Sequence, residues 1–336
     1  MNDYQVSILI PCYNTEQWIA SAIESALNQT YPNKEIIVVD DGSTDRSLEI
    51  IKSFGDRIRW ETGLNRGGNA ARNRLLELST GEWLQYLDAD DYLLPDKIET
   101  QIRFLSQISD ADIIYSPVIV EYHKDNHSWQ KIDRIPEPLP HDPCILLTRW
   151  HLPQTGGVLW RKEAIVDVGG WNEHQNCCQE NELYLRLLMA EKRFEYFDAP
   201  RAVYRAWSEL TVCRKDPSET YRWRLEIKDK IEQHLEAKCE LTQLRQDVIN
   251  QSRLECARII WNFDPGWAAN LVKKIHVINP NFTPSGSKIP KIYRFLYKIL
   301  GFSGVEQLAQ IKRLATQFKS LSNINALVGG KHPPRI

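Results

Sequence analysis

The chain has 336 residues, a formal net charge of −2 and a hydrophobic content of 42%. These values are ordinary for a folded protein and exclude a wholly disordered chain, a collagen and a disulfide-stapled miniprotein. The length exceeds that of one small domain and suits one large domain with an appendage.

Alternating strands and helices are predicted for the first hundred residues. Val6–Ile10 is a short, continuous apolar run, which is typical of a strand buried on both faces. Apolar residues then recur at helical spacing over residues 19–27. Glu35–Val39 and Glu82–Leu87 predict two more strands, with helices between them. This order favours an α/β fold with a doubly wound, mostly parallel sheet.

The middle of the chain has a less regular pattern. Ile113–Tyr122 and Gly156–Trp160 are expected to be strands, Pro136–Pro143 is a proline-rich loop, and a helix is expected over Asn181–Ala190. From about residue 215 the pattern becomes mostly helical. We therefore expect a domain boundary near that position.

Cysteine usage and apolar runs bear on the compartment. The seven cysteines are an odd number and include no CxxC pair, so neither a structural zinc site nor a complete disulfide framework is expected. No apolar run approaches the ~18 residues of a membrane span, and no secretory signal is visible at the N-terminus. The expected location is the cytoplasm.

Acidic residues follow two of the predicted strands. Asp88, Asp90 and Asp91 come directly after Glu82–Leu87, and clustered carboxylates need a compensating cation or proton. Oxygen ligands without histidine favour Mg²⁺ or Mn²⁺, although a solvated acidic turn is the alternative. After the second strand, Asp41 could accept a hydrogen bond from a nucleobase or ribose, or could simply belong to an Asp-Gly turn.

Two further sites carry candidate chemistry. Arg72 lies in the stretch NRGGNAARN, where a guanidinium and a helix N-terminus could approach phosphate, or where Arg72 could pair with a carboxylate. Glu180 and Glu182, two residues apart at a helix start, do not share a face. One of them could therefore enter a cleft while the other serves the helix dipole, although capping alone would also explain them.

Five segments together resemble family 2 glycosyltransferases: VSILIPCYN, VVDDGSTD, NRGGNAARN, GEWLQYLDADD and QENELYLR, in this order over about residues 6–207. Members of that family are inverting enzymes with a glycosyltransferase A fold and a nucleotide-sugar donor. The resemblance implies transfer of a sugar from a nucleotide-diphosphate donor, most often a UDP-sugar, to a hydroxyl acceptor. Saccharide, lipid-linked and protein-linked acceptors all fit, in the assembly of cell-surface polysaccharide, glycolipid or glycoprotein glycans.

The resemblance also implies roles on the donor side of the site. Pro11 and Tyr13, with Asp41, would frame the nucleobase and ribose, and Arg72 would lie near the donor. Together with Asp88, these four residues would form the nucleotide- and donor-binding part of the site.

Three acidic residues are given roles in the reaction itself. Asp90 would be the direct ligand of Mn²⁺ or Mg²⁺, and Asp88 would face the ribose or a metal-bound water. Glu180 would be the catalytic base. A base facing the donor from the side opposite its leaving group is what a single inverting displacement requires, since the acceptor hydroxyl must lose its proton.

Some positions depart from the family pattern. Many relatives have Asp where this chain has Glu180, and many have His where it has Trp207, so a histidine contact to phosphate or metal is not expected. Arg222-Trp223 only approximates the QxxRW motif of processive polysaccharide synthases, and membrane spans are missing from the sequence. A non-processive enzyme is therefore expected.

The resemblance assigns the domains. A catalytic domain is expected over residues 1–214, with a nucleotide-binding half of about 1–110 and an acceptor half of about 111–214. Residues 215–336 would be a mostly helical, basic extension. Two alternatives stay open: an inactive nucleotide-sugar-binding or scaffold protein that acts through this extension, and a nucleotidyltransferase, for which the expected glycine-rich basic loop after the first strand is missing.

Charge is distributed unevenly along the chain. From residue 271 onward there are eleven Lys and Arg but one carboxylate side chain, Glu306, which gives +10 and leaves −12 for the remainder. Such segregation is typical of a partner surface. Residues 271–336 are therefore expected either to contact an anionic membrane, on its cytoplasmic face, or to form a solvated face packed on the catalytic domain. Nucleic acid is not an expected partner.

Overall fold

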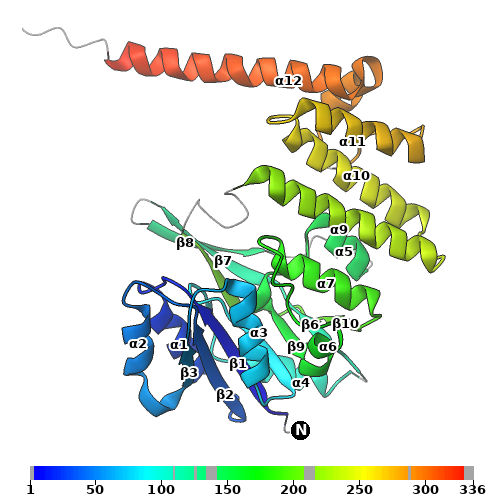
Figure 1. Cartoon of the computed structure of the whole chain (residues 1–336). Coiled ribbons are helices and arrows are strands. Elements are labelled where there is room, and N and C mark those ends of the chain that lie inside the picture. The colour runs from blue at the N-terminus through cyan, green and yellow to red at the C-terminus, as the bar shows by residue number, and fades with distance from the viewer. Residues whose placement is uncertain are drawn as a thin grey trace, which may run out of the picture. The chain divides into compact units, whose positions relative to one another are not determined.

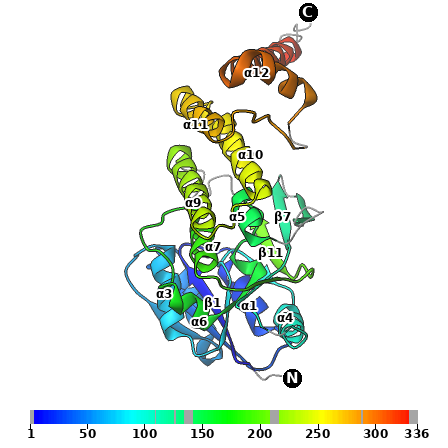
Figure 2. The same cartoon turned by 90° about the vertical axis from the view of Figure 1, so that its right-hand side faces the viewer.

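The computed structural model describes residues 4–108, 110–124, 127–133, 142–207, 216–286 and 289–328 (Figures 1 and 2). It divides into two compact units, residues 1–241 and 242–336, and each is described here by itself. The helical character begins near residue 215, as the sequence indicates, but the first helix after that position belongs to the first unit.

A seven-stranded sheet forms the centre of the first unit. All neighbouring strands are parallel except β9, which is antiparallel to both β4 and β6. In spatial order the strands are β10 (Phe194–Tyr196), β6 (Ile113–Tyr115), β9 (Val158–Arg161), β4 (Trp83–Tyr86), β1 (Val6–Cys12), β2 (Lys34–Asp40) and β3 (Arg59–Thr62).

A smaller, four-stranded sheet lies in the same unit. Its order is β5 (Tyr92–Leu93), β11 (Ala202–Ala206), β7 (Val118–Lys124) and β8 (His127–Asp133). The single strand expected over Ile113–Tyr122 is wrong, because Ser116 and Pro117 separate β6 of the large sheet from β7 of the small one. Residues 136–141 of the expected proline-rich loop lie outside the described residues.

Helices cover both faces of the large sheet. Alternate strand residues point to opposite faces, so Ile8 and Ile36 pack in one apolar cluster while Leu9 and Ile37 pack in another. The first cluster is closed by α1 (Ile19–Leu27), α2 (Ser47–Ser53) and α4 (Lys97–Leu105). The second is closed by α3 (Gly68–Leu78), α5 (Pro143–Arg149), α6 (Lys162–Asp167), α7 (Gln179–Met189) and α9 (Pro217–Ala237). The predicted α/β class with a mostly parallel, doubly wound sheet is confirmed.

The second unit is helical, as expected for the C-terminal region. It contains α10 (Gln243–Ile260), α11 (Pro265–Ile278) and α12 (Lys291–Val328), and α12 is interrupted at Gly301, whose φ is +67°. Among the helices that the structure describes, not one combines the length and the apolar character that crossing a bilayer requires.

Candidate active site

The candidate site lies at the carboxyl edge of the large sheet. β2 and β3 follow β1 on one side of the sheet, and β4 then lies on the other side of β1. The strand order therefore reverses between β1 and β4, which is the topological switch point of the sheet. Ligands of open α/β sheets bind at such a switch point. Asp40, at the end of β2, and Asp88, two residues beyond β4, both lie at this edge.

Hydrogen bonds join the loops that follow β1 and β2. The backbone N–H of Asp41 donates to the carbonyl of Cys12 at 2.8 Å, and the side chain of Asn14 accepts a bond from the second loop at 2.8 Å. Pro11 is the last residue but one of β1, and the half-exposed Tyr13 follows the strand, between Cys12 and Asn14. The three residues predicted to frame a nucleobase are therefore gathered at one place.

Asp41 holds the loop that begins α3. Its two carboxylate oxygens each accept a bond of 2.8 Å, from the backbone N–H groups of Arg66 and Gly67. The loops approach closely here, since a Cβ on Gly42, whose φ is +75°, would lie 2.8 Å from the backbone nitrogen of Asn65. Asp41 thus anchors the loop. The sequence predicted an Asp-Gly turn or a nucleotide contact at this position, but not this anchoring role.

Replacing Asp41 with alanine is expected to lower the free energy of unfolding by about 2–3 kcal/mol, because two backbone amides lose a charged acceptor. Urea unfolding followed by circular dichroism measures this loss. The matched control is Asp56→Ala, at an exposed position, which should change stability by less than about 0.5 kcal/mol. Equal losses for the two variants would show that Asp41 does not anchor the loop.

Arg72 connects α3 to β4 and α7. Its guanidinium donates to Asp88 at 2.8 Å and to Gln179 at 2.9 Å, and it lies over the ring of Trp171 at 4.9 Å. Burial disfavours the charge of Arg72, but the carboxylates of Asp88 and Glu180 oppose this and raise its pKa. A buried cation is thus held between the acidic groups of β4 and α7.

The acidic run after β4 concentrates negative charge. Asp88 also accepts a bond from the hydroxyl of Thr155 at 3.1 Å, in the short 3-10 helix Thr155–Gly157. Burial, followed by the neighbouring Asp88, raises the pKa of Asp90. Asp91 is fully buried, and burial together with its two acidic neighbours raises its pKa well above the ordinary range. A cation at this point would relieve the repulsion.

Trp207 contacts the predicted metal ligand. Its indole N–H donates to a carboxylate oxygen of Asp90 at 2.9 Å, and its ring packs against that of Trp18. The sequence indicated only that Trp207 stands where many relatives have histidine. An indole donates a hydrogen bond but cannot ligate a metal, so Trp207 orients Asp90 instead of adding a ligand.

Glu180 lies in the first turn of α7, beside Arg72. It is partly exposed, and burial followed by the field of Asp88 raises its pKa, against the opposing effect of Arg72. Glu182 has a different environment, since both of its oxygens pair with Arg186 at 2.8 Å. The two glutamates therefore face different surroundings, as their spacing predicts, and Glu180 is the one that faces the cluster.

The donor set for a metal is incomplete by itself. Within the described residues, no three His, Cys, Asp or Glu side chains are gathered in a way that could hold an ion. Asp88 and Asp90 nevertheless offer carboxylate oxygens, which Mg²⁺ and Mn²⁺ prefer. One oxygen of Asp91 is buried without a hydrogen-bond partner among the described residues. These residues fit a divalent ion that takes further ligands from a bound diphosphate.

Sequence reasoning missed several groups that complete the cluster. Thr155 contacts Asp88, which is 67 residues away in the sequence. Gln179 contacts Arg72 across 107 residues, and Trp171 also contacts Arg72. Single polar residues carry no periodic signal, so only Gln179, next to Glu180 in the segment QENELYLR, had a feature that could have drawn attention.

A doubly wound α/β sheet with acidic and basic groups at its switch point defines a class of proteins that bind nucleotide-like ligands at that edge. Residues 7–171 match the family model described as Glycosyl transferase family 2. Residues 7–171, just under half of the chain, are therefore a domain of this family, which confirms the resemblance seen in the sequence.

Similar proteins agree with this assignment. An uncharacterized glycosyltransferase of Haemophilus influenzae is 43% identical over 111 residues, which are 32% of this chain and 44% of that protein. One of Rickettsia typhi is 33% identical over 207 residues, 57% of this chain and 61% of that protein. The matched part is thus less than two thirds of either relative.

A solved structure shares the fold over most of the chain. S. aureus TarS 1–349, in complex with UDP, superposes with a TM-score of 0.62 at 16% identity and covers 92% of each chain. This likeness confirms the expected fold of the glycosyltransferase A type, including the helical C-terminal region.

Proposed function

We propose that the protein is an inverting, non-processive glycosyltransferase that moves a sugar from a UDP-sugar to a hydroxyl acceptor. The observation that carries the proposal is the placement of Arg72 between two acidic groups, the Asp88–Asp90 pair after β4 and Glu180 on α7. An inverting displacement needs a cation-stabilised leaving group on one side and a base on the other.

Glu180 is the proposed base. Its ionised carboxylate accepts the proton of the acceptor hydroxyl as the oxygen bonds to the anomeric carbon and the bond to the leaving diphosphate breaks. No hydrogen bond to this carboxylate is formed by the described side chains, so its oxygens stay available to an acceptor. Arg72, which carries its charge throughout, holds Asp88 in place and keeps the region between the two acidic groups cationic.

Asp90 and Asp88 are the proposed holders of Mn²⁺ or Mg²⁺, Asp90 directly and Asp88 through water or the ribose. When bound, such an ion stabilises the negative charge that develops on the departing diphosphate. Trp207 fixes one oxygen of Asp90 at 2.9 Å and leaves the other for the ion.

Pro11, Tyr13 and Asp41 are the proposed contacts to nucleobase and ribose. The structures of S. aureus TarS contain UDP and UDP-GlcNAc, which supports a uridine nucleotide on this fold. We further propose that the acceptor is a saccharide or a lipid- or protein-linked glycan, in cell-surface polysaccharide or glycoconjugate assembly. The six cysteines in the described part of the chain are free thiols, in agreement with the proposed cytoplasmic location.

The stereochemistry of the product tests the proposal. UDP-, GDP-, CDP- and dTDP-sugars with an α-linked anomeric carbon are each incubated with the protein and Mn²⁺, with water or simple saccharides as acceptors. Proton NMR of the first product is expected to show the β-anomer from a UDP-sugar. An α-linked first product would rule out an inverting reaction, and release of sugar 1-phosphate in place of a nucleoside diphosphate would indicate nucleotidyl transfer.

On acidification, the activity is expected to be lost at a higher pH than for an enzyme whose base is a glutamate of ordinary pKa. Glu180 acts as a base only when ionised, so kcat/KM decreases as the pH falls through its pKa. Burial and Asp88 raise that pKa above the ordinary 4.5, which places the midpoint of the acid limb above this value. A pH profile of UDP release measures the midpoint, with circular dichroism to show that the protein stays folded. A midpoint at or below 4.5, or an identical profile for Glu180→Gln, would contradict the assignment.

A further inference from the structure

The first segment of α12, residues 291–300, presents an apolar strip to solvent. Ile292, Phe295 and Ile299 are 63%, 61% and 62% exposed. They are three and four residues apart, so they lie on one face of the helix. The opposite side is anchored within the second unit, because Tyr293 and Tyr297 are buried and donate or share hydrogen bonds with Glu306 and His276. The exposed strip is therefore a fixed surface.

Cations line one edge of this strip. At 100° per residue, Lys291, Arg294 and Lys298 follow one another along the side of the helix next to Phe295 and away from the buried tyrosines. Lys291 and Lys298 are exposed. A helix with a bulky apolar face and a Lys/Arg-rich flank is typical of segments that lie in a membrane interface.

The segments that carry these cations contain no exposed carboxylate among the described residues. Glu306 is the one carboxylate side chain in the sequence from residue 271 onward. It is 1% exposed and pairs internally with Arg258 at 3.0 Å. The second half of α11 and the start of α12 therefore contribute exposed cations and no exposed carboxylate.

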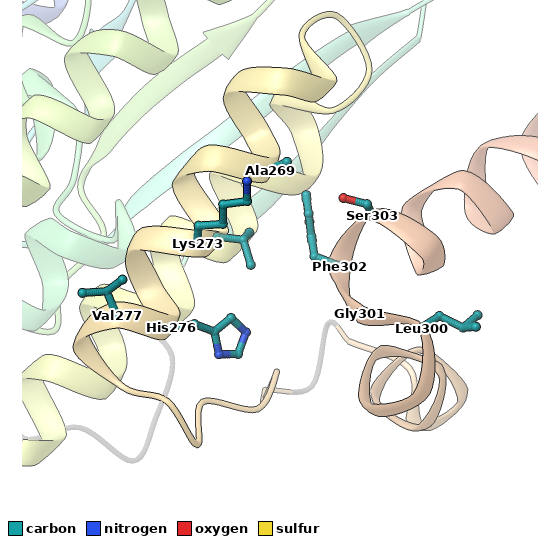
Figure 3. A pocket seen from close by; sticks show the side chains of 9 residues that line it. Ala269, Lys273, His276, Val277, Leu300, Gly301, Phe302 and Ser303 are labelled. Carbon is teal, nitrogen blue, oxygen red and sulfur yellow. The ribbon is translucent and has the colours of Figure 1, made fainter.

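A pocket extends the apolar surface toward α11. Its volume is about 620 Å³, and Val272, Val277, Leu300 and Phe302 line it together with Lys273 and His276 (Figure 3). Val277 is 83% exposed and Leu300 is 45% exposed, so the pocket opens beside the strip. An apolar cavity with Lys273 at its wall suits one acyl chain, with a lipid phosphate near Lys273.

We propose that this surface, the strip Ile292/Phe295/Ile299 with its flanking cations and the neighbouring pocket, docks on an anionic phospholipid bilayer. The positive charge of the surface favours an anionic bilayer over a second copy of the chain, because a symmetric contact would bring the two sets of cations together. The apolar strip favours a bilayer over nucleic acid, which would gain nothing from covering isoleucine side chains. The proposal is independent of the donor and of the reaction.

Vesicle flotation of the full chain without nucleotide tests the proposal. Vesicles of phosphatidylcholine alone are compared with vesicles that contain about 30% phosphatidylglycerol, at about 0.05 M and 0.5 M salt. We expect binding to the anionic vesicles that weakens as salt is added. Lys291→Glu/Lys298→Glu should reduce the partition coefficient by about 25-fold or more, and Ile292→Ser/Phe295→Ser by about tenfold or more.

Matched variants keep the test specific. Lys52→Glu/Lys131→Glu makes the same change of charge on the first unit, and Leu244→Ser removes an exposed leucine of α10. Both should float like the unchanged protein. The proposal is overturned if the full chain does not bind anionic vesicles at low salt, or if the α12 variants bind them as well as the control variants do. It is equally overturned if those variants instead abolish a dimer seen by light scattering or binding to an RNA oligonucleotide.

Discussion

Replacing Glu180 with glutamine is expected to lower the rate of sugar transfer by about 10²–10⁴-fold and to leave donor binding nearly unchanged. Glutamine has almost the shape of glutamate but cannot accept the acceptor's proton. Glu180 has no hydrogen-bond partner among the described side chains, so the change breaks no contact that holds α7. UDP release from the preferred donor, with calorimetry of UDP binding, measures the two effects separately.

Glu182→Gln is the matched control for this variant. Glu182 lies on the same first turn of α7 but pairs with Arg186, away from the cluster. Its replacement should change transfer by only a few-fold. Glu180→Asp should retain part of the activity, since the carboxylate is kept and merely shortened. Normal transfer by Glu180→Gln would mean that another group is the base.

Arg72→Met is expected to cost about 3–5 kcal/mol of unfolding free energy and to abolish measurable UDP binding. The guanidinium is buried, pairs with Asp88 at 2.8 Å and donates to Gln179 at 2.9 Å. Methionine has a similar length but leaves Asp88 without its cation, and it removes the contact between α3 and α7. Urea unfolding and calorimetry are the measurements.

Arg74→Met separates this effect from a general loss of charge on α3. Arg74 lies two residues further along the helix, and its ion pairs with Glu61 and Glu77 are half-exposed. Exposed ion pairs contribute little, so this variant should lose less than about 1 kcal/mol and bind UDP normally. If Arg72→Met is no more destabilised than Arg74→Met, the buried pair does not hold the site together.

Most strands and helices of the first hundred residues follow from the sequence because apolar periodicity dominates there. Val6–Cys12 and Lys34–Asp40 are central strands with continuous apolar runs. Arg59–Thr62 was not predicted, since this edge strand is only four residues long and contains two exposed and two partly buried residues but no buried one. The small sheet was also missed. The residues on both sides of Ser116 and Pro117 are apolar, so the sequence does not show that the chain passes there from one sheet to the other.

The site was predicted as separate motifs, and the contacts between them required the structure. The acidic run, Arg72 and Glu180 were each recognised by residue type and position. That Arg72 would pair with Asp88, and that Asp41 would hold the loop before α3, depends on side-chain directions set by the packing of α3 on the sheet. The bond from Trp207 to Asp90 links residues 117 positions apart and has no signal in the sequence.

Calorimetric titration of the full chain with UDP, once with Mn²⁺ and once with chelator, tests the central claim most directly. The donor set of Asp88 and Asp90 is incomplete without a diphosphate, so we expect UDP to bind with Mn²⁺ at least about tenfold more tightly than without it. Mn²⁺ alone should bind weakly, and Asp90→Ala should lose the metal dependence. Absence of UDP binding under both conditions, with the protein folded, would contradict the proposal that this edge of the sheet is a nucleotide-sugar site.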